Sequence, residues 1–145
     1  MTDENISIEE IRRIIEEKAE AVRTKDVIRA TAAYAPNVVV FDVVGPLQYL
    51  GSDSIRKRLE EWLSTFDGSI GFENREVLID ACEDAGFGSC LNHVTATTKA
   101  GGKLDMWWRE TACYRKVAGR WVITHQHSSV PFNAETGKAS IDLHP

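Results

Sequence analysis

The chain has 145 residues, of which 43% are hydrophobic, and this is enough for one globular domain with a packed core. Its 17 Lys and Arg against 22 Asp and Glu give a formal charge of −5 without a long basic block, which argues against nucleic acid as a partner. The acidic N-terminus contains no continuous apolar segment, so we expect neither a secretion signal nor a membrane partner.

Helical spacing of apolar residues predicts two helices in the first 35 residues. Ser7 and Glu10 form an S-x-x-E capping box, which predicts a helix start. The apolar face that follows consists of Ile8, Ile11, Ile15, Ala19 and Val22. A second, shorter helix is expected to begin near Asp26 and to be halted by Pro36.

The next segments predict a short hairpin and a third helix. Residues 37–50 read as a β-branched strand, a Gly-Pro turn and a second short strand. Residues 51–68 predict a capped helix with Ile55, Leu59, Trp62 and Leu63 on one side. Its "RKR" run at 56–58 is interpreted as a solvated helix face.

The second half of the chain reads as strand. Four runs, about 70–82, 85–98, 103–117 and 120–130, are separated by the turns "EDAG", "AGGK" and "VAG", which predicts a four-stranded antiparallel meander. Residues 1–130 are therefore expected to form a single domain, and residues 131–145 a C-terminal tail that wraps the domain or frays. Three cysteines without CxxC spacing, all in apparent strands, predict buried thiols in the cytoplasm: Cys82, Cys90 and Cys113.

Helices collected on one side of an antiparallel sheet make an α+β domain. A strongly curved sheet of this kind forms a cone that the N-terminal helices close, and the space inside it is a pocket. The long final strands also present an outer face that needs covering, so we expect a homodimer packed through that face.

The element order and one long motif resemble a known superfamily. The segment "RETACYRKVAGRWVITHQHSSVPF" is similar to the R-x-T…G-x-W-x-I-x-H-x-H-x-S-x-P ending of SnoaL-like proteins and of the calcium/calmodulin-dependent kinase association domain. The pattern is carried by Arg109, Thr111, Gly119, Trp121, Ile123, His125, His127, Ser129 and Pro131. Both groups belong to the nuclear-transport-factor-two-like superfamily, with ketosteroid isomerase and scytalone dehydratase. The resemblance implies a cystatin-like, cone-shaped fold, and it covers nearly the whole chain.

A second resemblance concerns the candidate general base. The segment "YAPNVVVFDVVGP" is similar to the ketosteroid isomerase segment that ends in D-P-V-G, so the role of the base falls on Asp42. The enzyme's oxyanion hole consists of a Tyr and a protonated Asp, as the known example shows. Here Lys18 stands at the position of the hydroxyl donor, and Thr111 or its neighbour at that of the acid, so this chain departs from the isomerase pattern.

Two carboxylates are candidates for proton transfer. Asp42 lies between "VVVF" and "VV", and in such apolar surroundings a carboxylate can serve as a base. The alternative is that Asp42 caps the Gly45-Pro46 turn or faces solvent. Glu110 becomes a second interior carboxylate, suited to act as the acid, if the histidine-bearing face of the neighbouring strand is the outer one.

The "HQH" sequence at 125–127 has three interpretations. Regular alternation places His125 and His127 on one strand face with Trp121 and Ile123, and a three-residue "VAG" loop would add Arg109 and Thr111 to that face, whereas a two-residue turn would reverse the pairing. The histidines could then begin a metal site with a third ligand, which nothing in the motif completes. They could instead contact a substrate in the pocket, or form a polar network across a dimer interface, which we favour.

The remaining pocket residues are predicted from strand alternation and from the aromatic set. These ligand-binding candidates are Tyr34, Trp62, His93, Trp108, Arg109, Tyr114 and Gln126. The sequence thus favours a small, largely apolar carbonyl-type ligand, processed by isomerisation, cyclisation or dehydration with no cofactor and no metal. The alternative is a non-catalytic ligand-binding or oligomeric assembly domain, and the sequence does not decide whether the protein is an enzyme.

Overall fold

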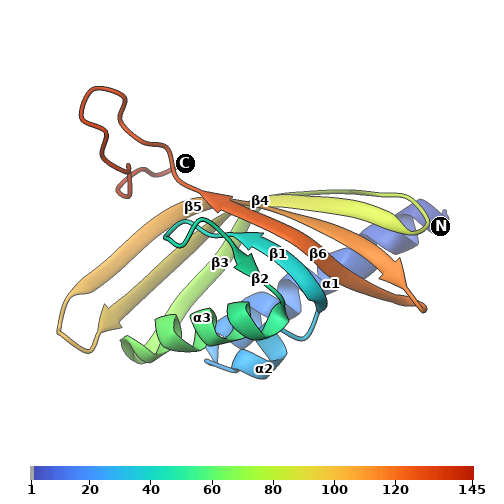
Figure 1. Cartoon of the computed structure of the whole chain (residues 1–145), viewed down its shortest axis with the longest axis horizontal. Helices are drawn as coiled ribbons and strands as arrows, with labels where there is room; N and C mark the ends of the chain where they lie inside the picture. The colour runs from blue at the N-terminus through green and yellow to red at the C-terminus, as the bar shows by residue number, and fades with distance from the viewer. Residues whose placement is uncertain (1) are drawn as a thin grey trace.

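The computed structural model describes residues 2–145, which form an α+β domain with a strongly curved sheet (Figure 1). In chain order the elements are α1 (Asp3–Arg23), α2 (Val27–Ala30), β1 (Tyr34–Phe41), β2 (Tyr49–Leu50), α3 (Ser52–Ser64), β3 (Phe66–Ala81), β4 (Ala85–Thr98), β5 (Lys103–Val117) and β6 (Arg120–Ser129). The predicted α+β class and element order are confirmed. Within residues 2–145, no helix has the length and apolar character required to cross a bilayer.

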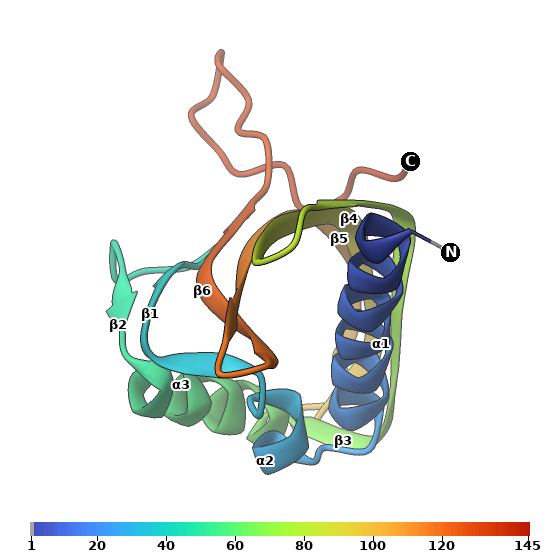
Figure 2. The ribbon, with the colours of Figure 1, turned by 90° about the vertical axis from the view of Figure 1, so that its right-hand side faces the viewer.

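The six strands form one sheet with the order β2-β1-β6-β5-β4-β3. Strands β3 to β6 are the predicted antiparallel meander, and the short hairpin joins it through a parallel pairing of β1 with β6. Figure 2 shows that the sheet bends around the interior, with α1 on its concave side and α3 with α2 below. The helices thereby close the cone that the sequence predicted.

Three helix boundaries differ from the prediction. The third helix, predicted over 51–68, ends at Ser64, and β3 already begins at Phe66. The first helix begins at Asp3, because the Thr2 hydroxyl accepts a hydrogen bond from the Asn5 backbone N–H at 3.2 Å and caps the helix there. The predicted cap, Ser7, is instead buried within the helix. The second helix ends at Ala30, and Pro36 lies inside β1, where the pairing with β6 is irregular and a missing N–H is tolerated.

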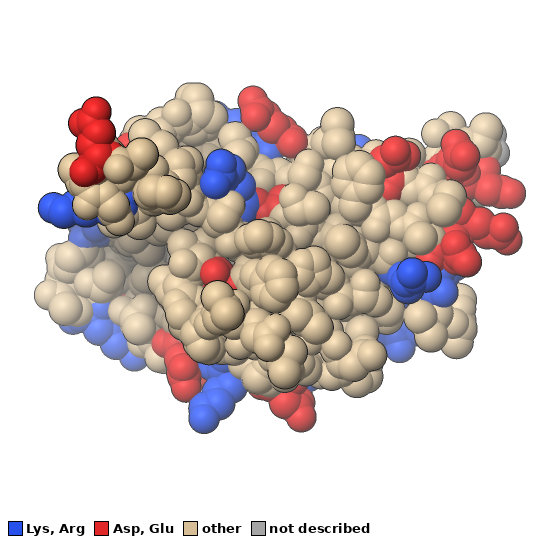
Figure 3. Space-filling model, turned by 45° about the horizontal axis from the view of Figure 1, so that its top comes forward, with Lys and Arg blue, Asp and Glu red and all other residues tan. Residues whose placement is uncertain are grey.

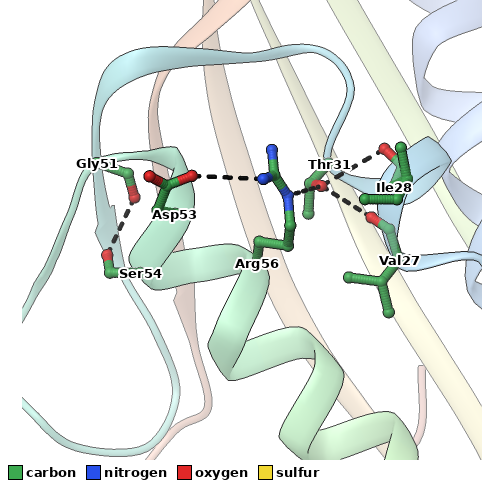
Figure 4. A network of polar contacts seen from close by, with 7 residues as sticks. All are labelled: Val27, Ile28, Thr31, Gly51, Asp53, Ser54 and Arg56. Carbon is green, nitrogen blue, oxygen red and sulfur yellow. Dashed lines mark hydrogen bonds and ion pairs between the residues drawn. The ribbon is translucent and has the colours of Figure 1, made fainter.

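A hydrogen-bonded network joins α2 to α3 and fixes the helical wall of the domain (Figure 4). The buried Thr31 hydroxyl donates to the Val27 carbonyl at 2.8 Å and accepts from Arg56 Nε at 3.3 Å. The Arg56 guanidinium also pairs with Asp53 of the same helix at 3.3 Å. Because α2 has only four residues, this link holds it against the longer helix.

The turn between β5 and β6 is the shorter of the two alternatives that the sequence left open. Val117 pairs with Arg120, so only Ala118 and Gly119 form the turn, and both have positive φ (50° and 79°), as the tight two-residue hairpin turn requires.

A β-bulge in β6 restores the pairing that the longer loop would have produced. Cys113 pairs with His125 while the next residue, Tyr114, pairs with Ile123, so Thr124 is an extra residue on β6. Strand alternation reverses at this point. We expected Trp121 and Ile123 on the histidine face, which is wrong: both are buried inside the cone.

The apolar core consists of two clusters of buried residues. One packs Ile11 of α1 against Val38 and Val40 of β1 and Ile123 of β6. The other packs the C-terminal part of α1 and α3 against β3 and β4. Members of both clusters line a cavity on the concave side of the sheet.

Candidate functional site

A cavity of about 160 Å³ lies between the sheet and the helices. Its apolar wall consists of Val22, Val43, Val44, Ile55, Leu59, Trp62, Phe72, Met106 and Trp108. Its polar side chains are Lys18, Thr31, Tyr34, Asp42, Arg58, Asn92, Glu110, Gln126 and Ser128. An apolar cavity of roughly 150 Å³ holds benzene, so this volume suits a molecule about that size.

Lys18 is the centre of a hydrogen-bonded cluster in the buried part of the cavity wall. Its Nζ donates to the Tyr34 Oη and, at 2.9 Å, to the Gln126 Oε1. The Tyr34 hydroxyl donates to the same Gln126 oxygen at 2.7 Å. An ammonium has three N–H groups. Because these contacts use two of them, the third can donate to a molecule in the cavity.

The charges around Lys18 keep it protonated. Burial by itself lowers the pKa of Lys18, but the nearby Tyr34 and Glu110 oppose this effect, and the net pKa is raised. Burial is the largest influence on Tyr34 and raises the pKa of its hydroxyl. The Lys18 ammonium partly opposes this effect. Both groups therefore retain their protons at neutral pH and act as hydrogen-bond donors, and Lys18 is not an amine nucleophile.

Glu110 is held near this cluster by a buried asparagine. Asn92, which is 1% exposed, donates from Nδ2 to the Glu110 Oε1 at 3.3 Å. The Asn92 Oδ1 accepts from Asn74 Nδ2 at 2.7 Å and from the Cys90 thiol at 3.3 Å. Burial, followed by the Glu110 charge, raises the pKa of Cys90 to about 12, so Cys90 remains a thiol. Within residues 2–145, the second carboxylate oxygen of Glu110 forms no hydrogen bond with another side chain or the backbone.

Asp42 occupies a more exposed part of the wall, beside α3. Arg58 Nε donates to the Asp42 Oδ2 at 3.1 Å, and the Val43 N–H donates to the Oδ1 at 2.8 Å. The interpretation of residues 56–58 as a solvated face is wrong for Arg58, whose side chain is only 22% exposed. Both oxygens of Asp42 thus have partners, in contrast to those of Glu110.

Three aromatic rings form one corner of the cavity. The Trp62 and Trp108 rings meet edge to face with centroids 6.1 Å apart, and Phe72 lies 5.9 Å from Trp108. Aromatic walls of this kind favour a flat, apolar molecule.

The structure brings six of the twelve predicted site residues together in the cavity wall. Those that line the cavity are Tyr34, Asp42, Trp62, Trp108, Glu110 and Gln126. Tyr114 is buried in the core beside them, and burial raises its pKa. His93, Arg109 and Thr111 lie on the outer face of the sheet and not in the cavity wall.

The two histidines of the "HQH" sequence also lie on the outer face. His125 is half-buried, and its Nδ1 lies 2.7 Å from the Val39 carbonyl oxygen; His127 is exposed. The Phe41 ring packs edge to face with both imidazoles. No cluster of three His, Cys, Asp or Glu side chains suited to a metal ion occurs within residues 2–145.

His93 belongs to a charged cluster on the outer face. Its ring is stacked on Trp107, with 4.1 Å between centroids. Its two nitrogens lie 3.0 Å from a Glu73 oxygen and 2.7 Å from an Asp105 oxygen, while Arg75 pairs with Glu73. Burial alone lowers the pKa of His93, but the hydrogen bonds to Glu73 and Asp105 oppose it and the net pKa is raised.

This cluster predicts a pH dependence of stability. Because the pKa of His93 is higher in the folded state, its contribution is fully present below the unfolded pKa and is lost as the pH rises through the folded value. We expect the free energy of unfolding, measured with urea, to decrease from pH 6 towards pH 9. His93→Gln should flatten that decrease, whereas His144→Gln in the exposed tail should not. An unchanged slope in His93→Gln would refute the assignment.

Sequence reasoning missed five polar residues of the cavity as site residues: Lys18, Thr31, Arg58, Asn92 and Ser128. A signal existed for two of them. Lys18 is spaced seven residues from Ile11 and four from Val22, on the buried face of α1. Asn92 alternates with the buried Cys90 and Val94 on β4. A polar residue in a buried series is an informative exception.

Comparison with known proteins identifies the family. The family model of the SnoaL-like domain matches residues 11–133. No curated protein matches the chain in sequence. An NTF2-like protein of unknown function from Pseudomonas putida KT2440 is 31% identical, with a TM-score of 0.88, over 97% of this chain and 98% of that one.

Two more distant structures share the fold. A nuclear transport factor 2 (NTF2-like) superfamily protein from Salmonella enterica has a TM-score of 0.80 at 17% identity, covering 94% of this chain and 99% of that one. A ketosteroid isomerase-like protein from Erwinia carotovora atroseptica has a TM-score of 0.71 at 22% identity, covering 84% and 94%. At these identities the likeness concerns the fold alone.

Proposed function

The chain belongs to the SnoaL-like domain family, and we propose that its cavity binds a small, largely apolar carbonyl compound and transfers a proton on it without a cofactor. One observation carries the proposal. A buried, hydrogen-bonded ammonium, that of Lys18, lies near the carboxylate of Glu110 in a cavity with mostly apolar walls. A buried ammonium with a perturbed pKa, beside a carboxylate in such a cavity, is typical of sites for acid–base chemistry.

Lys18 would bind the oxygen of the carbonyl group, while the single O–H of Tyr34 remains donated to Gln126. The remaining N–H of Lys18 donates to that oxygen, and the ammonium stabilises the negative charge that develops there. Both donors are held in place before the substrate arrives, because Gln126 accepts from each of them. The apolar wall strengthens the interaction by excluding water.

Glu110 would remove the proton. Its Oε2 takes a proton from the carbon next to the carbonyl; the C–H electron pair forms the C=C bond of an enolate, and the carbonyl π pair moves to oxygen. Returning the proton to a different carbon isomerises the compound, whereas its delivery to a departing hydroxyl group releases water. We assign the base to Glu110 because it lies in the Lys18 cluster and has an oxygen without a protein partner.

Asp42 would have a different role in the same site. Its pairing with Arg58 joins the end of β1 to α3 beside the cavity and keeps that wall in position. The carboxylate nevertheless lines the cavity and can exchange a proton with a substrate once its partners move. Asp42 is therefore the second candidate for the base.

The proposal is tested with simple ketones. Native mass spectrometry of the purified protein shows whether a small molecule is retained. Titration with 2-cyclohexenone should quench the fluorescence of the cavity tryptophans, Trp62 and Trp108. Cyclohexanone incubated with the protein in D2O should exchange its α-protons for deuterium faster than with buffer alone, as observed by NMR. Quenching without exchange would mean ligand binding without catalysis. The absence of both quenching and exchange would refute the proposal.

The cysteines support a cytoplasmic location for this reaction. Cys82, Cys90 and Cys113 are all free, as is usual in a reducing compartment. The expectation that all three are buried holds only for Cys90: Cys82 is exposed just after the end of β3, and Cys113 is only partly buried.

A further inference from the structure

A groove on the helix side of the domain is lined by three arginines from three different elements. Its volume of about 360 Å³ is more than twice that of the cavity, about 160 Å³. The three residues are Arg13 of α1, Arg29 of α2 and Arg120 at the start of β6. Figure 2 shows α1 and α2 beside the turn that joins β5 to β6. Folding therefore gathers guanidinium groups that lie far apart in the sequence.

Two of these guanidinium groups have no partner in the protein. The chain contains ten arginines. Within residues 2–145, seven of them form a hydrogen bond or an ion pair through the side chain, and the exceptions are Arg13, Arg115 and Arg120. Two of the three exceptions line this one groove. A guanidinium binds a carboxylate through two parallel N–H donors, so a pair of unoccupied ones provides an anion site.

The acidic residues of the groove do not neutralise this pair. Glu10 accepts a hydrogen bond from the Trp121 indole N–H at 2.6 Å and pairs with Lys116 at 3.5 Å. Glu17 is then the one acidic residue of the groove, among those that the structure describes, that stands against the two unpaired arginines. The chain as a whole has a formal charge of −5, and in Figure 3 its Lys and Arg side chains are scattered, mostly along the rim. The positive charge of the groove is therefore local.

The groove also has an apolar part. It consists of Ile14, Ala30, Ala33 and Trp121. Trp121 is only 7% exposed, and the hydrogen bond to Glu10 holds its ring in place. An apolar ring can pack against such a surface while a charged group attached to it meets the arginines.

We propose that this groove binds a small organic carboxylate, with its charge on Arg13 and Arg120 and its apolar part against Trp121. Two arginines opposed by one glutamate suit a single negative charge better than the two charges of a phosphate group. Among residues 2–145, Lys18 alone lines both the groove and the cavity, and its ammonium is held in the cavity wall. The site is thus distinct from the cavity, and the inference does not depend on the reaction proposed there.

The test is a titration of the protein with sodium benzoate, followed by NMR of the tryptophan indole N–H groups. Trp121 reports on the groove, whereas Trp62 and Trp108 report on the cavity. The assigned Trp121 signal should shift with a dissociation constant of about 1 mM, an affinity appropriate to so small a molecule. The signals of the two cavity tryptophans should move much less. Benzyl alcohol, which has the ring without the charge, should leave the Trp121 signal in place at the same concentrations.

Variants of the two unpaired arginines show whether they bind the carboxylate. Arg13→Gln and Arg120→Gln should each raise the dissociation constant of benzoate by about 10-fold or more, because each removes a charge-assisted hydrogen bond. Both side chains are exposed, so both variants should fold, as their NMR spectra will show. Arg115→Gln is the matched control: it removes an equally exposed, unpaired arginine that lies outside the groove, and it should bind benzoate like the wild type.

Four results would overturn the proposal. The first is a benzoate shift confined to Trp62 and Trp108, which would place the ligand in the cavity. The second is wild-type affinity in both groove variants. The third is an equal response to benzyl alcohol, which would show that the charge has no part in binding. The fourth is inorganic phosphate that binds as tightly as benzoate, which would show that the apolar part of the groove contributes nothing.

Discussion

Replacing Lys18 with methionine should reduce kcat/KM for proton exchange by about 100- to 1,000-fold, the usual effect of removing one donor from an oxyanion site. The variant loses the only ammonium in the cluster with Tyr34 and Gln126, and with it the N–H that would bind the carbonyl oxygen. Tyr34 keeps its hydrogen bond to Gln126, so this part of the cavity wall retains its arrangement in the variant. Deuterium incorporation into cyclohexanone, measured by NMR, gives the rate.

The same variant should fold, with reduced stability. Methionine matches the length of the lysine stem, but it leaves Glu110, Tyr34 and Gln126 without the ammonium, and removing one partner of a buried charged cluster costs about 3 kcal/mol or more. The rate is therefore measured on variant protein whose far-UV circular dichroism and urea unfolding transition show that it is folded. Lys57→Met on the exposed side of α3 is the matched control and should retain the wild-type rate. Wild-type exchange by folded Lys18→Met would show that the ammonium has no part in the reaction.

Replacing Glu110 with glutamine should have an effect as large, for a different reason. The amide keeps the shape of the side chain and the contact with Asn92, but it cannot accept a proton. General base catalysis contributes about 100- to 10,000-fold, so the exchange rate should fall by a factor in this range. Substrate binding, followed by tryptophan quenching, should change much less than the rate.

Asp42→Asn provides the comparison that decides between the two carboxylates. Because Asp42 is paired with Arg58, we expect a smaller loss of rate than in Glu110→Gln, together with weaker ligand binding from a displaced wall. If Asp42→Asn loses more activity with unchanged binding, Asp42 is the base. Glu110→Gln should also lower the pKa of Lys18, because the Glu110 charge is one of the causes that raise it. This shift can be followed by NMR without any substrate.

The strand boundaries were predicted closely from the sequence, because the residues that determine them are neighbours in the chain. Turn residues and β-branched runs predicted 85–98 and 103–117 with the boundaries that β4 and β5 have, and β6 ends one residue earlier than expected. The apolar spacing predicted the position of helix α1, but the residue that caps the helix was predicted wrongly. The sequence placed the cap at Ser7, whereas the contact with the Asn5 N–H places it at Thr2.

The cavity was only partly predictable, because its polar contacts join distant parts of the chain. The pairing of Asp42 with Arg58 spans 16 residues, and that of Lys18 with Gln126 spans 108. Family resemblance placed Lys18 at a donor position, yet nothing local indicated that Tyr34 and Gln126 would meet it. Tyr34 and Gln126 were found as pocket residues, whereas their shared partner was not.

The extra residue at Thr124 reverses, midway along β6, which alternate side chains face the interior. Before it, odd-numbered side chains such as Ile123 point inward; after it, even-numbered ones such as Gln126 do. Deletion of Thr124 would remove the bulge and leave a regularly alternating strand with the same residues inside, whereas deletion of another residue of β6 would shift its neighbours to the opposite face. Sequence alignments of relatives should therefore treat a gap at Thr124 as loss of the bulge, not as a change in loop length.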